Sequence, residues 1–111
     1  MRVVVESLLA EQAALLRRGE VRALAARYSA DAQIVHSGGV AAGRDEIEAV
    51  FAAQFAEGVV LESLNEVGRG DDCVNYRAVL TVGGARIAVA GTFVLRDGEI
   101  WRHTTIVTTD S

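Results

Sequence analysis

Apolar side chains in the first half of the chain recur every three or four residues, which is the spacing of one helix face. The first run predicts a helix over residues 4–18, ended by Gly19, with a face formed by Val5, Leu8, Leu9, Gln12, Leu15 and Leu16. A second, shorter helix is predicted from Val21, Leu24, Ala25 and Tyr28. A third helix, over residues 44–56, has on one face Ile47, Val50, Phe51 and Phe55.

The pattern then changes to segments rich in Val, Ile, Thr and aromatic residues, at residues 59–67, 73–82, 85–96 and 99–108. Gly83-Gly84 and Asp97-Gly98 separate the last three segments by two residues each, the strongest short-range signal of a β-hairpin. A short extended segment before the third helix places Ala32, Ile34 and His36 on one side. The prediction is an α+β fold: three N-terminal helices on a long, curved antiparallel sheet, with a pocket at one end.

Length and composition predict one domain over residues 1–111, and half of these residues are hydrophobic. No apolar run approaches the roughly 20 residues of a membrane span, so no membrane partner is expected. The net charge is −4 and no basic cluster exceeds Arg17–Arg18, which argues against a nucleic-acid partner. The single cysteine, Cys73, cannot form an internal disulfide, and the expected location is therefore the cytoplasm. Neither a metal site nor a cofactor is expected, because the chain lacks closely spaced metal-ligand motifs and a phosphate loop.

Three stretches of the sequence carry a resemblance to a known family: "GEVRALAARYSADAQIV", "AGRDEIEAVF" and "FVLRDGEIWRHTTIV". They resemble segments of the SnoaL-like and ketosteroid-isomerase-like branch of the NTF2-like superfamily, whose fold is a cone. The resemblance extends from about Glu6 to Thr108, although Ala30 stands where the family often has an acid. It implies the cone-shaped fold more strongly than one function, because this scaffold carries cyclases, isomerases, hydrolases, dehydratases and binding domains.

The resemblance assigns three positions of the ketosteroid-isomerase site, and all three depart from that enzyme's pattern. His36 falls where those enzymes hold a catalytic carboxylate base, at the mouth of the cone. Gln12, which interrupts an apolar helix face, replaces the tyrosine of the oxyanion hole. Gly91 replaces the protonated aspartic acid. Ketosteroid isomerisation itself is therefore not expected.

Two further residues become candidates when the resemblance decides which face of the sheet points inward. Periodicity alone does not assign the face of His103, but the resemblance places it on the concave side with Thr105 and Val107. Tyr76 shares a face with Ala78 and Leu80, and the resemblance turns that face inward. A histidine can give or take a proton near neutral pH. The predicted catalytic residues are therefore His36, His103 and Tyr76.

A larger set is expected to contact a ligand: Gln12, Leu16, Tyr28, Val50, Phe51, Phe55, Ala78, Val89, Gly91, Trp101, Thr105 and Val107. Two interpretations stay open. One is an acid–base enzyme of the cyclase, isomerase or dehydratase type, acting without a cofactor on a small apolar carbonyl compound. The other is a ligand-binding or dimerisation module without catalysis, in which His36 lies at the rim and His103 at a dimer interface. Either interpretation is compatible with a homodimer formed through the apolar outer face of the sheet.

Overall fold

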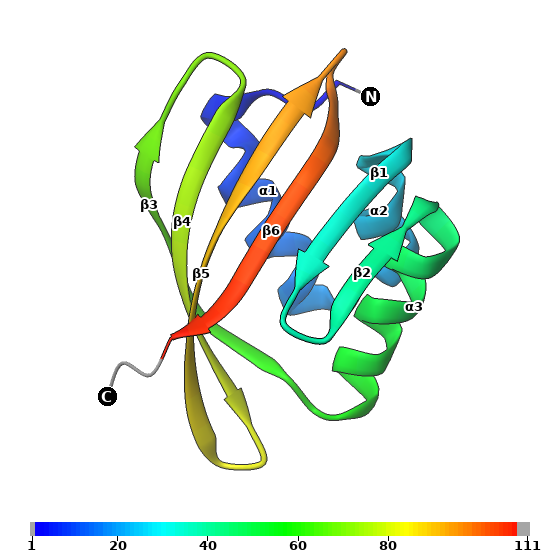
Figure 1. Cartoon of the computed structure of the whole chain (residues 1–111). Coiled ribbons are helices and arrows are strands. Elements are labelled where there is room, and N and C mark those ends of the chain that lie inside the picture. Colours follow the sequence, from blue (N-terminus) through cyan, green and yellow to red (C-terminus); the bar gives the residue numbers. More distant parts are fainter. Residues whose placement is uncertain (1, 109–111) are drawn as a thin grey trace.

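The chain folds into a six-stranded sheet with three helices against one face (Figure 1). A computed structural model describes residues 2–108. The elements are α1 (Val5–Arg18), α2 (Val21–Ala26), β1 (Tyr28–His36), β2 (Gly39–Ala42), α3 (Gly43–Ala56), β3 (Val60–Arg69), β4 (Cys73–Val82), β5 (Ala85–Arg96) and β6 (Glu99–Thr108). The strand order is β2-β1-β6-β5-β4-β3. This arrangement confirms a mixed α+β fold.

Local sequence signals account for most of the element boundaries. Gly19 ends α1 in the left-handed conformation, with φ of 67°, where a side chain would be strained. Asp97 and Gly98 both have positive φ, as a two-residue hairpin turn between twisted strands requires. The predicted bounds of the last three strands are confirmed, and the helices differ from their predicted bounds by one residue at α1 and α3.

The region around β1 differs from the prediction in two ways. Tyr28 begins β1 and does not lie on the second helix, because α2 ends at Ala26. The glycines after His36 form a tight turn, and β2 returns antiparallel to β1 with His36 paired to Gly39. β1 also pairs with β6 in parallel, so the sheet is not purely antiparallel. The parallel pair aligns Ile34 with His103, which brings two distant sequence segments together on the inner face.

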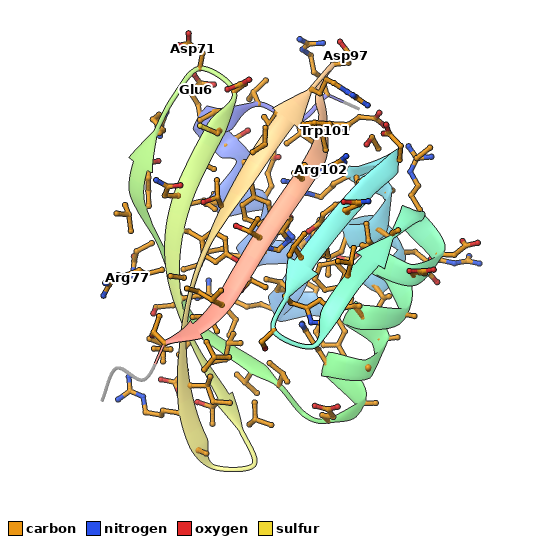
Figure 2. The ribbon with its side chains drawn as sticks, viewed as in Figure 1. Glu6, Asp71, Arg77, Asp97, Trp101 and Arg102 are labelled. Atoms are coloured by element: carbon orange, nitrogen blue, oxygen red, sulfur yellow. The ribbon has the colours of Figure 1, made fainter. Side chains whose placement is uncertain are left out.

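A bulge in β6 changes which residues of that strand point inward. The β5–β6 register shifts between Val94 and Leu95, which pair with Arg102 and Ile100, so that Trp101 is an extra residue. Ile100 and His103 are consequently both buried, although an uninterrupted strand would place them on opposite faces. The expectation that Trp101 faces the pocket with His103 is wrong for this reason. Figure 2 shows Trp101 and Arg102 next to one another on β6 near the β5–β6 turn.

Candidate functional site

A cavity of about 360 Å³ lies between the sheet and the helices. Its wall is mostly apolar, and most of the predicted pocket residues form part of it: Gln12, Leu16, His36, Phe51, Phe55, Tyr76, Ala78, Val89, His103, Thr105 and Val107. The strands β4, β5 and β6 supply one side, while α1 and α3 supply the other. The alternation along β4, β5 and β6 thus places the strand residues of this set on the cavity wall, as predicted.

Four predicted ligand contacts lie outside the cavity wall. Tyr28 is fully buried behind it, and Val50 packs against the core from α3. Trp101 stacks on the guanidinium groups of Arg96 and Arg102, whose central carbons lie 4.6 and 3.9 Å from its ring centre. The fourth is Gly91 of β5, which pairs with Tyr76 of β4.

Arg27 is the starting point of a buried hydrogen-bond chain that ends at the cavity. Only 3% of this arginine is exposed, and its Nε donates to Gln12 Oε1 at 3.0 Å. Its other nitrogens donate to the Leu8 carbonyl oxygen at 3.2 Å and to the Glu11 carboxylate at 2.9 Å. Since a guanidinium only donates, the amide of Gln12 must turn its oxygen toward Arg27 and its nitrogen away.

The chain continues through two tyrosines and a histidine. Gln12 Nε2 donates to Tyr28 Oη at 3.4 Å, and Tyr28 Oη lies 2.9 Å from His103 Nδ1. His103 Nε2 lies 2.7 Å from Tyr76 Oη, which belongs to the cavity wall. The imidazole also stacks on Phe93 of β5, with ring centres 4.1 Å apart. Both ring nitrogens of His103 are therefore occupied inside the protein.

Burial keeps the groups of this chain uncharged. Desolvation lowers the pKa of His103 to about 3, because no nearby anion compensates a buried imidazolium. Desolvation raises the pKa of Tyr76 to about 12, partly offset by a hydrogen bond with the Thr105 side chain. The pKa of Tyr28 is also raised, first by desolvation and then by Tyr76. At neutral pH the chain consists of a neutral imidazole between two protonated phenols.

The direction of the hydrogen bonds follows from the donor at the start of the chain. Tyr28 accepts a hydrogen from Gln12, and its own proton therefore goes to His103 Nδ1. A neutral imidazole that accepts at Nδ1 carries its proton on Nε2, and this proton is donated to Tyr76. Tyr76 is left with a hydroxyl proton that no earlier member of the chain uses. The hydroxyl can present this proton to Thr105 or to an acceptor in the cavity.

Gly91 makes room for the hydroxyl of Tyr76. The two residues are paired across β4 and β5, and the glycine has no place in the cavity wall itself. A methyl group at position 91 would lie 2.5 Å from Tyr76 Oη and closer still to the carbonyl oxygen of Thr104. Here glycine is required by the close approach of a ring and a neighbouring strand. The resemblance implies an acid at position 91. The glycine found there allows the ring of Tyr76 to lie across β5.

His36 lies at the end of β1 and is half-buried in the cavity wall. The backbone N–H of Gly38 donates to its Nδ1 at 3.1 Å. In the neutral ring the proton is then on Nε2. The side chain therefore offers a donor at Nε2, while the lone pair of Nδ1 accepts the hydrogen bond from Gly38. His36 and His103 line the same cavity, but neither has a free lone pair in this arrangement.

Sequence reasoning missed several members of the site. Arg27 was not predicted because an arginine just after the end of a short helix gives no local sign of burial. Phe93 was missed although the alternation of β5 places it beside Tyr76. Glu57 and Gln54 of the α3 end also line the cavity, so an acid is present in the wall, where none was predicted.

Among residues 2–108, no three His, Cys, Asp or Glu side chains gather in a way that could hold a metal ion. No helix in this part of the chain has the length and apolar character needed to cross a membrane.

A comparison with protein families identifies the chain. A model of the SnoaL-like domain matches residues 9–103, which is most of the sequence. The chain belongs to the SnoaL-like domain family. The resemblance noted in the sequence is thereby confirmed, whereas none of the curated proteins compared with this SnoaL-like protein matches it significantly.

Solved structures share the fold of this SnoaL-like protein. A protein from Sphaerobacter thermophilus has a TM-score of 0.84 at 23% identity, with 97% of this chain and 99% of that chain covered. A proposed polyketide cyclase from Xanthomonas campestris pv. campestris has a TM-score of 0.80 at 18% identity, covering 93% and 89%. A protein with a ketosteroid isomerase-like fold from Catenulispora acidiphila, solved with trimethylamine, has a TM-score of 0.69 at 24% identity, covering 86% and 81%. At these identities the likeness establishes the fold alone.

Proposed function

We propose that this SnoaL-like protein binds a small, mostly apolar molecule that carries an acceptor oxygen, and that Tyr76 donates a hydrogen bond to that oxygen. The observation that supports this most directly is the directed chain from Arg27, which leaves the proton of Tyr76 available at the cavity wall. Chains of buried hydrogen bonds polarise one another, so the last donor is stronger than an isolated phenol.

The shape and lining of the cavity support the choice of ligand class. A volume of about 360 Å³ lies at the lower end of the range for small-molecule sites. The wall is dominated by leucine, valine and phenylalanine side chains, with the polar groups gathered near Tyr76 and at the mouth. A bicyclic ketone, whose one polar atom is the carbonyl oxygen, has this distribution of polarity.

Catalysis without a cofactor would use the same contact. When a proton leaves the carbon next to a carbonyl, negative charge develops on the oxygen, and the Tyr76 hydroxyl stabilises that charge. The base at the mouth would be His36, which takes the proton at Nδ1 and releases the hydrogen bond from Gly38. Isomerisation, cyclisation and dehydration of carbonyl compounds all pass through such an enolate.

A second candidate function is binding without catalysis. It is favoured by one observation: both nitrogens of His103 are held by tyrosines, and Nδ1 of His36 is held by Gly38. In this case the protein has a strong donor for the ligand oxygen but no group poised to remove a proton.

Binding of α-tetralone, compared with its hydrocarbon analogue tetralin, tests the shared part of the proposal. The variant Tyr76→Phe keeps the ring and removes the donor, so we expect ketone affinity to fall about five- to tenfold and tetralin affinity to stay unchanged. Titration calorimetry measures both ligands on both proteins. An equal effect of the substitution on ketone and hydrocarbon would contradict the role of Tyr76.

The same ketone separates catalysis from binding. In D₂O, proton NMR follows the loss of the hydrogens next to the carbonyl, which exchange whenever an enolate forms. An enzyme accelerates this exchange above the buffer rate, and the acceleration disappears in Tyr76→Phe. A binding protein holds the ketone with no acceleration, and that outcome would favour the second candidate function.

We also propose that the protein forms a homodimer through the outer face of the sheet. This face presents small or apolar side chains that point away from the cavity: Ala88, Ala90, Thr92, Val94, Thr104 and Ile106. Ile106 is 60% exposed in the single chain, and such a surface favours contact with a second copy over water.

A further inference from the structure

We infer that Gln12 is a positioning residue that sets the direction of the hydrogen-bond chain, and that it thereby selects ligands that accept a hydrogen bond over ligands that donate one. The ligand part of this inference rests on the proposed function. The part that concerns the chain itself does not, because the direction is a property of the protein without ligand.

Most members of the chain could run in either direction. A tyrosine hydroxyl can donate to one neighbour and accept from the other in either order, and a neutral imidazole has two tautomers. Tyr28, His103 and Tyr76 therefore do not by themselves determine the direction of the hydrogen bonds. The bonds between them, at 2.9 and 2.7 Å, are compatible with both orders.

Only the first two members are fixed in their roles. Arg27 donates and never accepts, and it is 3% exposed, so its Nε must find an acceptor inside the protein. The amide of Gln12 accepts this hydrogen at Oε1, and only its Nε2 remains for Tyr28. The Gln12 amide therefore accepts a hydrogen from Arg27 at one end and donates a hydrogen to Tyr28 at the other. A side chain with acceptors at both ends could not donate to Tyr28.

Glutamate in place of Gln12 reverses every later bond without a change of shape. One carboxylate oxygen accepts from Arg27, whose guanidinium favours the ionised form. The other oxygen can only accept, so Tyr28 donates to it and takes a hydrogen from His103 Nδ1. His103 Nε2 then accepts from Tyr76, whose proton points into the protein and whose lone pair faces the cavity.

The tautomer of His103 tests the direction. Long-range ¹H–¹⁵N NMR spectra distinguish a protonated ring nitrogen from an unprotonated one, and the measurement is made at pH 8 without ligand. In the wild-type protein we expect the proton on Nε2 and a bare Nδ1; the opposite result would overturn the inference whether or not any variant folds. In Gln12→Glu we expect the proton on Nδ1, and an unchanged tautomer would overturn the inference.

A matched control separates direction from charge. Gln54→Glu introduces the same carboxylate into the cavity wall from α3, outside the chain. It should leave the His103 proton on Nε2. A change of tautomer in this variant would show that negative charge in the cavity, and not the amide at position 12, governs the direction.

A pair of ligands tests the consequence for selectivity. α-Tetralone accepts a hydrogen bond, whereas α-tetralol of nearly the same shape also donates one. We expect Gln12→Glu to shift the affinity ratio of the two about tenfold toward the alcohol. If the tautomer reverses and the ratio does not, Gln12 does not determine selectivity; if neither compound binds to the wild-type protein, the proposed function fails while the tautomer result stands.

Discussion

The buried imidazole of His103 makes the stability of the protein depend on pH in a calculable way. Its pKa is about 3 in the folded protein, against an ordinary value of 6.5 in the unfolded chain. The unfolded state therefore binds a proton below pH 6.5 that the folded state does not bind. Stability contributed by this group is complete above pH 6.5 and falls as the pH decreases toward 3.

The size of the loss follows from the two pKa values. Relative to pH 8, the free energy of unfolding should fall by about 1 kcal/mol at pH 5.5 and by about 3 kcal/mol at pH 4.5. The full difference between the two pKa values corresponds to about 5 kcal/mol. No reduction for solvent screening applies, because the ring is buried and packed on Phe93.

Urea unfolding of the wild-type protein and of His103→Gln, at four pH values between 4.5 and 8, measures this effect. The variant keeps a polar group between the two tyrosines but has no proton to bind, so the difference between the two proteins cancels the titration of all other groups. We expect the difference between the unfolding free energies of the two proteins to narrow as the pH falls. A constant difference over this range would refute a buried neutral histidine, and NMR titration of the wild-type ring provides an independent check, since it should stay neutral to about pH 4.

Three further predictions concern other parts of the structure. Gly91→Ala should cost about 3 kcal/mol of stability, measured by urea unfolding, and should remove the preference for ketone over hydrocarbon, because the new methyl group displaces the hydroxyl of Tyr76. Arg27→Met should cost about 2–4 kcal/mol, since it leaves the buried acceptor of Gln12 without a donor, and a variant of the half-exposed Glu11 should cost under about 1 kcal/mol in the same assay. Ile106→Glu should convert a dimer to a monomer in sedimentation equilibrium, and a wild-type monomer would contradict the proposed interface.

Much of the architecture could be predicted because local signals and the global fold agree. The two-residue turns at Gly83-Gly84 and Asp97-Gly98 fixed the registers of β4, β5 and β6, and those registers placed Tyr76, Ala78 and Val89 on the cavity wall. Gln12 stood out for a similar reason, because a polar residue on an apolar helix face needs a buried partner.

The features that sequence reasoning missed depend on contacts between distant segments. The bulge at Trp101 leaves no mark in the alternation of β6, since an extra residue is recognised only against its partner strand. Tyr28 fits the sequence pattern of a helix end and also that of a strand start. The structure makes it the first residue of β1, where it pairs with Ile100 of β6, and this pairing joins distant segments of the chain. Arg27 resembles any surface arginine until α1 and β6 enclose it.

The contact of Trp101 with two arginines has a practical consequence for spectroscopy. This is the only tryptophan of the sequence, and it lies outside the cavity wall, with Arg96 and Arg102 against its ring. Its fluorescence therefore reports on the integrity of the β5–β6 hairpin and not on occupation of the cavity. Unfolding can thus be followed by the emission of Trp101, while binding has to be detected by heat or by NMR.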